Sequence, residues 1–97
     1  MSNYSTMTET IDKEVVELLE KELLQSKLIV YNDDFNTFDW VIQSIVDVCG
    51  HNLIQAEQLS HIIHFSGKAT VKSGSQDVLK PLKDGLTDRG LSAVIEQ

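Results

Sequence analysis

The chain has 97 residues, of which 41% are hydrophobic and 24% are charged, and this allows one domain with one modest core. Its net charge of −7 argues against nucleic acid and anionic membranes as partners, because both bind clustered Lys and Arg. No apolar run approaches the roughly 20 residues that span a bilayer, and the single cysteine, Cys49, excludes an internal disulfide and a cysteine-based zinc site. The first residues lack a signal-peptide pattern, so we expect a cytoplasmic protein.

The N-terminal part differs in character from the rest. Residues 1–9 are polar and rich in Ser and Thr, and we expect them to be disordered. Residues 10–25 predict an amphipathic helix with an apolar stripe that could pack on the domain, on a second copy or on a partner. We therefore divide the chain into an N-terminal extension, residues 1–26, and a domain, residues 27–97. The stripe consists of Ile11, Val15, Leu18, Leu19 and Leu23.

The domain opens with a predicted strand and helix. Residues 28–31 are apolar and β-rich, and the Asn-Asp-Asp run at 32–34 favours a turn. Thr37 is a suitable N-cap for a helix. On this helix Trp40 could be exposed and contact a partner, but we expect it to cover part of the sheet. We expect Cys49 to be a small core residue rather than a nucleophile.

A second helix is expected directly afterwards. Gly50 is well placed to stop the first helix. Asn52 begins the next, with Gln55 in the position of a capping box, and Gly67 ends it.

The C-terminal third predicts a strand over residues 68–72, a helix over 76–88 and a strand over 91–96. Pro81 and Gly85 both disfavour that helix, so a kink or a late start near Pro81 is expected. The order strand-helix-helix-strand-helix-strand, after a leading helix, predicts an α/β sandwich of the α+β type. Its sheet would be small, three-stranded and mostly antiparallel, with helices on one face.

Two segments carry a resemblance to a known family. Residues 29–42 read IVYNDDFNTFDWVI, and residues 63–69 read IHFSGKA. Together they resemble the signature of the ClpS adaptors, and Gly90-Leu91 is a weaker third match. The resemblance covers about residues 27–96 of this chain.

The resemblance implies an adaptor rather than an enzyme. ClpS proteins bind the first residue of a substrate when it is Leu, Phe, Tyr or Trp, which marks the substrate as an N-degron. They also bind the N-terminal domain of a ClpA- or ClpC-type unfoldase and so deliver the substrate to the ClpP peptidase. No cofactor and no metal are implied, and we expect a monomer.

The resemblance also assigns site residues. It puts the substrate's ammonium group at Asn32, Asp34 and His64, with Asp33 close by. These residue types suit the task, because a free N-terminus is a compact cation with three N–H donors and needs converging acceptors. The implied hydrophobic pocket has Asn36 and Thr37 at its rim and is lined by Phe38, Val41, Ser60, Ile63 and Leu91.

Two pocket positions depart from the family pattern. Many relatives carry Met where this chain has Ser60, and a serine there predicts a roomier or more polar pocket. Phe38 stands where a gating residue is often Met, and its stiffer ring would hold or reshape that gate.

Other interpretations of these residues are open from the sequence. The fold could serve a general protein-interaction module, like the C-terminal domain of the ribosomal stalk protein, without N-degron binding. His61 and His64 are spaced to share a helix face and could bind a metal. Asp33, Asp34 and His64 could act as acid and base, although no nucleophile or oxyanion hole accompanies them.

Overall fold

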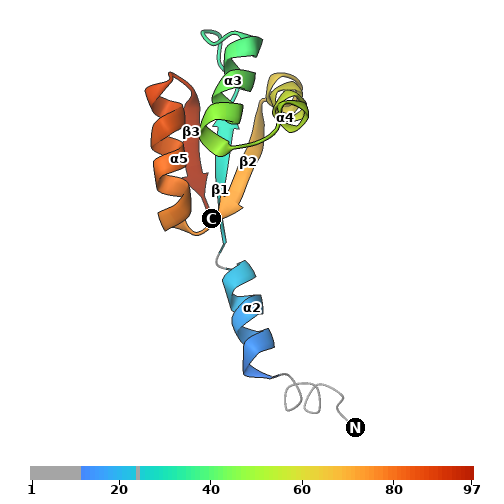
Figure 1. Ribbon diagram of the computed structural model, residues 1–97, viewed down its shortest axis with the longest axis vertical. Coiled ribbons are helices and arrows are strands. Elements are labelled where there is room, and N and C mark those ends of the chain that lie inside the picture. The colour runs from blue at the N-terminus through green and yellow to red at the C-terminus, as the bar shows by residue number, and fades with distance from the viewer. Residues whose placement is uncertain (1–11, 24) are drawn as a thin grey trace.

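The computed structural model describes residues 12–23 and 25–97 (Figure 1). The three-stranded antiparallel sheet and the order of the elements agree with the predicted α+β architecture. In chain order the elements are α2 (Lys13–Leu23), β1 (Ser26–Tyr31), α3 (Phe38–Cys49), α4 (Leu53–Ser66), β2 (Lys68–Gly74), α5 (Gln76–Asp88) and β3 (Ser92–Glu96).

The sheet has the strand order β2-β1-β3, and β1 is antiparallel to both neighbours. The most apolar strand is therefore central, where its backbone is paired on both sides. At the end of β1, Tyr31 pairs with Lys68 of β2 and with Ser92 of β3. Because β2 directly follows α4, this register holds the loop after β1 beside the C-terminal end of α4.

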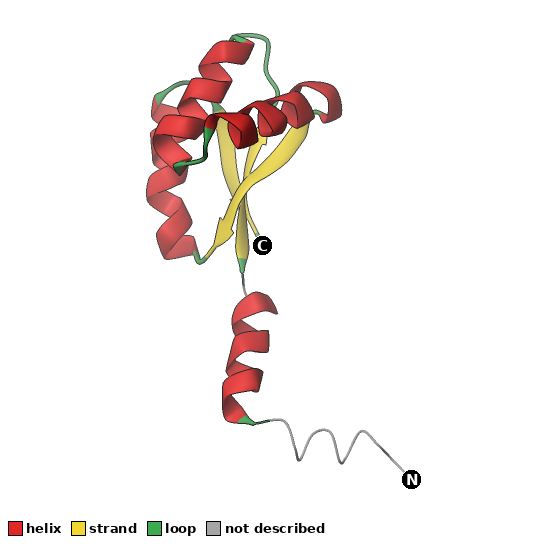
Figure 2. Ribbon diagram, turned by 45° about the vertical axis from the view of Figure 1, so that its right-hand side comes forward, coloured by secondary structure: helices red, strands yellow, loops and turns green. Residues whose placement is uncertain are grey.

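The core lies between one face of the sheet and three helices, α3, α4 and α5 (Figures 1 and 2). Cys49 is buried in it, as predicted, and burial raises the pKa of its thiol despite the opposing charge of Lys72. A protonated, enclosed thiol is a poor nucleophile. The largest fully enclosed apolar side chains come from the central strand and from α3 and α5: Leu28, Val30, Ile45, Leu79 and Leu86.

The helix α5 begins at Gln76, so the expected late start near Pro81 is wrong. Ser75 caps the helix by accepting a hydrogen bond from the Val78 N–H at 3.3 Å. Gly85 lies against α3: a Cβ at this position would come within 2.9 Å of Val48 Cγ1. The close contact between α3 and α5 thus explains a glycine inside a helix.

Trp40 does not cover the sheet, contrary to the expectation from sequence. It is 41% exposed, and its indole Nε1–H donates to the Arg89 carbonyl at 2.9 Å. The Arg89 guanidinium lies 5.2 Å from the centre of the indole ring and forms an ion pair with Asp47 at 3.0 Å. Trp40 therefore ties the start of α3 to the end of α5.

Helix α2 stands apart from the sheet and its helices (Figure 1). Asp12 precedes it and accepts a hydrogen bond from the Val15 N–H at 2.9 Å. Val15, Leu18 and Leu19 are 42%, 67% and 55% exposed, so this part of the predicted stripe does not pack on the domain. Residues 1–11 and the Leu23 side chain lie outside the described part. Within the described residues, no helix is long and apolar enough to cross a membrane.

Candidate functional site

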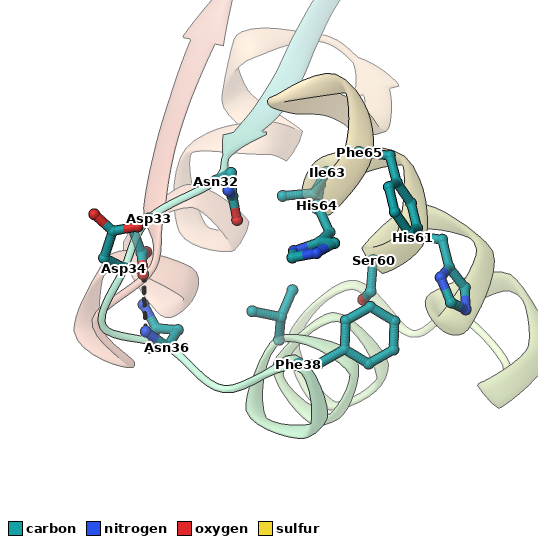
Figure 3. A pocket seen from close by; sticks show the side chains of 11 residues that line it. Asn32, Asp33, Asp34, Asn36, Phe38, Ser60, His61, Ile63, His64 and Phe65 are labelled. Atoms are coloured by element: carbon teal, nitrogen blue, oxygen red, sulfur yellow. Dashed lines mark hydrogen bonds between the residues drawn. The ribbon is translucent and has the colours of Figure 1, made fainter.

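A cavity of about 420 Å³ opens between the loop after β1, the first turn of α3 and the C-terminal half of α4 (Figure 3). Its volume lies in the range of small-molecule and peptide side-chain sites. Polar side chains lie toward the loop, and apolar and aromatic ones lie toward the helices. The lining residues are Asn32, Asp33, Asp34, Asn36, Phe38, Val41, Ser60, His61, Ile63, His64 and Phe65.

The C-terminus of α4 holds the loop after β1 in place at the polar end of the cavity. Gly67 terminates that helix with φ of 91°, a left-handed conformation that favours glycine, and its N–H donates to the Ile63 carbonyl at 2.9 Å. The Gly67 carbonyl in turn accepts the Asn32 N–H at 2.8 Å. This hydrogen bond joins the loop after β1 to α4, so that Asn32 and His64 face the same cavity.

The loop itself is organised by Asp33. Its Oδ1 accepts the backbone N–H groups of Phe35 and Asn36 at 2.9 and 2.8 Å, and its Oδ2 accepts Asn36 Nδ2 at 2.7 Å. Asn36 Nδ2 also donates to the Gly90 carbonyl at 2.9 Å, which links the loop to the segment before β3. Both carboxylate oxygens of Asp33 therefore accept hydrogen bonds from within the loop. Asp34, by contrast, is exposed and accepts no hydrogen bond from another described residue.

These hydrogen bonds lower the pKa of Asp33. Partial burial by itself raises the pKa of this carboxyl, but the backbone and side chain of Asn36 and the backbone of Phe35 outweigh that effect. The carboxylate thus stays charged well below neutral pH. It gives the polar end of the cavity a fixed negative charge beside that of Asp34.

Aromatic rings form the wall toward α4. The ring of Phe38 lies 4.8 Å from that of His61 and 6.5 Å from that of His64, measured between centroids. Phe65 stacks on His61 at 6.1 Å and meets His64 edge-on at 4.9 Å. Both histidines are thus held among aromatic faces, and His64 also reaches toward the polar end (Figure 3).

All the predicted site residues line this cavity except Thr37 and Leu91. Thr37 is the N-cap of α3 and accepts the Trp40 N–H at 3.1 Å, so its hydroxyl serves the helix. Leu91 is 4% exposed and belongs to the core behind the cavity. Their assigned pocket contacts are not present in this structure.

Sequence reasoning missed two lining residues, His61 and Phe65. His61 stands three residues before His64, and Phe65 stands four residues after His61, and both spacings bring side chains together on a helix surface. The spacing of His61 and His64 in the sequence suggests only a metal ligand at His61. Among the described residues, no group of three or more His, Cys, Asp or Glu side chains is arranged to hold a metal ion. Helix periodicity applied to the whole of α4 could have found both residues.

The family model described as "ATP-dependent Clp protease adaptor protein ClpS" matches residues 20–93. This chain belongs to the ClpS family. It is accordingly a non-catalytic adaptor of the Clp protease. The acid-base interpretation of Asp33, Asp34 and His64 is thereby excluded.

Relatives in two corynebacteria support the assignment. An ATP-dependent Clp protease adapter protein ClpS of Corynebacterium diphtheriae is 31% identical over 94 residues, which cover 96% of this chain and 83% of that protein. The protein of the same name from Corynebacterium glutamicum strain R is 33% identical over 98 residues, covering 100% and 98% of the two chains.

The fold is shared with a solved relative. The structure of Agrobacterium tumefaciens ClpS2 bound to L-phenylalaninamide superposes with a TM-score of 0.71 at 20% sequence identity. The match covers 74% of this chain and 94% of that one. At this level of identity the comparison establishes the common fold alone.

Proposed function

We propose that this ClpS-family protein binds the first residue of proteins that begin with Leu, Phe, Tyr or Trp and delivers them to a Clp unfoldase. The observation that carries the proposal is the division of one cavity into two ends. At one end, the side chains of Asn32, Asp34 and His64 can accept hydrogen bonds. The other end is formed by the apolar side chains of Phe38, Val41 and Ile63. An N-terminal residue has the matching order of groups, an ammonium followed by an apolar side chain.

The polar end suits an ammonium better than a neutral amide. The carboxylates of Asp33 and Asp34 and the acceptors of Asn32 and His64 face a ligand that brings one positive charge and three N–H donors. Asp33 acts through its charge and by shaping the loop, since its oxygens already accept three hydrogen bonds. Hydrogen bonds that involve a charged group contribute about 1.5–3 kcal/mol each, so the ammonium is a main source of affinity.

The apolar end suits one large side chain. The wall is made by rings and branched aliphatic groups, and burial of a Leu or Phe side chain contributes roughly 1.5–3 kcal/mol. The name of the ClpS2 structure supports this assignment, because L-phenylalaninamide carries a free α-ammonium and an aromatic side chain. Those are the two groups that the proposal assigns to the polar and apolar ends of this cavity.

Delivery requires a second surface. As a Clp protease adaptor, the protein works with a Clp unfoldase. We propose that the contact is made with the N-terminal domain of a ClpA- or ClpC-type enzyme, by a monomer, in the cytoplasm. The net charge of −7 is consistent with a protein partner rather than nucleic acid or membrane.

The test is fluorescence anisotropy with labelled peptides that differ only at the first residue: Leu, Phe, Tyr, Trp, Ile or Met. Wild-type protein should bind the first four in the micromolar range, and His64→Ala should bind them much more weakly. Glu57→Ala is the matched control, because Glu57 is exposed on the same helix and does not line the cavity. Equal or absent binding across the set would instead favour an interaction module without N-degron recognition.

A further inference from the structure

Ser60 places a hydroxyl without a partner at the apolar end of the cavity. The residue lies on α4, is 1% exposed and lines the cavity. Within the described part of the chain, its Oγ has no hydrogen-bond partner. Figure 3 shows this hydroxyl directed toward the ring of Phe38. Because buried hydroxyl groups in native proteins are nearly always hydrogen-bonded, Ser60 favours a ligand that supplies the missing partner.

Two other buried serines also have hydroxyl groups without a partner, and their positions differ from that of Ser60. Ser26 and Ser44 are 0% exposed, and their Oγ atoms likewise lack a partner among the described residues. Neither of them lines the cavity. Only at Ser60, of these three, can a bound ligand come near the hydroxyl, so Ser44 serves as a matched control.

The surroundings of Ser60 are otherwise apolar on the side of α3. Phe38 and Val41 line the same cavity, Figure 3 shows the Phe38 ring next to Ser60, and Phe38 is 37% exposed. The Ser60 Oγ is shielded from solvent in this arrangement, so a ligand ring reaches it when the Phe38 ring turns outward. A ring that carries a hydroxyl would then pair with Ser60, whereas a plain ring would leave it unpaired.

We infer that Ser60 is a specificity-determining residue that makes this pocket prefer Tyr over Phe as the first residue of the substrate. The inference deepens the proposed function and rests on it. The phenolic O–H and the Ser60 hydroxyl can each donate and accept, so one hydrogen bond forms in either direction. Tyr and Phe differ only in the phenolic hydroxyl. The difference in affinity between a Tyr and a Phe peptide therefore measures this one contact.

The experiment compares two peptides that are identical except for Tyr or Phe at the first position. For the wild type we expect the Tyr peptide to bind roughly three- to tenfold more tightly, which corresponds to one neutral hydrogen bond. In Ser60→Ala the preference should vanish or reverse, because the phenolic hydroxyl would then be buried without a partner. Ser44→Ala should keep the wild-type ratio.

Each remaining outcome overturns the inference. A wild-type ratio near one, or a preference for Phe, shows that Ser60 does not pair with the ligand. A Tyr preference that survives in Ser60→Ala assigns the contact to another group, such as His61. Should Ser60→Ala not fold, the wild-type ratio still decides. Tight but equal binding of both peptides leaves the proposed function standing, whereas binding of neither peptide overturns both.

Discussion

Asn36 Nδ2 lies 2.7 Å from Asp33 Oδ2 and 2.9 Å from the Gly90 carbonyl oxygen, so one amide group joins the loop after β1 to the segment before β3. The loop carries Asn32 and Asp34, which face the cavity. The position of these two side chains therefore depends on hydrogen bonds made by Asn36 within the protein.

The first prediction concerns this amide. Asn36→Ala removes both of these hydrogen bonds and leaves Asp33 Oδ2 without its donor, so the link between the loop and the segment before β3 is lost. We expect affinity for a Leu or Phe peptide to fall by about tenfold, equivalent to about 1.4 kcal/mol, as measured by anisotropy. Asn52→Ala is the comparison, because Asn52 caps α4 outside the cavity and should affect thermal stability rather than binding. Unchanged affinity in Asn36→Ala would contradict the role of the loop.

The second prediction concerns the Asp33 carboxyl. Its folded-state pKa is lowered below the usual value of 3.8, so Asp33 stabilises the fold above that value and this contribution is lost as the pH falls through the folded-state pKa. NMR titration of the carboxyl carbon should show a midpoint below 3.8. In Asn36→Ala the midpoint should move upward, because the side-chain hydrogen bond from Asn36 Nδ2 to the carboxylate is gone, while the two backbone hydrogen bonds remain. A midpoint at or above 3.8 in the wild type would be inconsistent with the loop geometry.

The third prediction is a pH dependence of substrate binding. A neutral His64 can accept a hydrogen bond from the ammonium, whereas a protonated imidazole has no acceptor and adds a like charge. Peptide affinity should therefore decrease between about pH 8 and about pH 5.5. Asp33 and Asp34 line the same cavity, and the lowered pKa of Asp33 keeps that carboxylate charged over this range; His61 lines the cavity as well.

Two variants identify the residue responsible. His64→Ala should bind weakly and show little pH dependence, and His61→Ala should keep the decrease of the wild type. A flat profile for the wild type would count against His64 as an acceptor. A decrease that disappears in His61→Ala would assign the effect to the other histidine.

The fourth prediction concerns stability. Trp40→Phe removes the hydrogen bond to the Arg89 carbonyl and weakens the contact with the guanidinium group. We expect a loss of about 1 kcal/mol in the free energy of unfolding by urea denaturation. Phe35 provides the control, since it is 95% exposed and Phe35→Ser should leave stability unchanged. Equal stability of Trp40→Phe and the wild type would show that Trp40 does not tie α3 to α5.

Elements whose signals are local could be predicted from the sequence. The cap residues Thr37 and Asn52 and the stop at Gly67 act within a few residues, and each is found in its expected role. The membership in the ClpS family follows from motifs of the same local kind. What failed depends on distant partners. Helix α5 starts at Gln76 although Pro81 lies within it, and its Leu79 and Leu86 are buried in the core that it shares with the sheet.

The same distinction holds at the site. The position of Asp33 suggested a ligand, but its hydrogen bonds to the loop are visible only in the structure. The sequence alone predicts that Trp40 covers the sheet, because its contacts with Arg89, 49 residues away, appear only in the structure. The unpartnered hydroxyl of Ser60 likewise depends on how α3 and α4 face each other.

The most direct test of the central claim is calorimetric titration with two Leu peptides, one with a free N-terminus and one acetylated. If the polar end recognises the ammonium, acetylation removes the charge and most of the donors and should weaken binding by at least about 100-fold. Equal affinity for the two peptides would contradict the proposed recognition of the N-terminal residue.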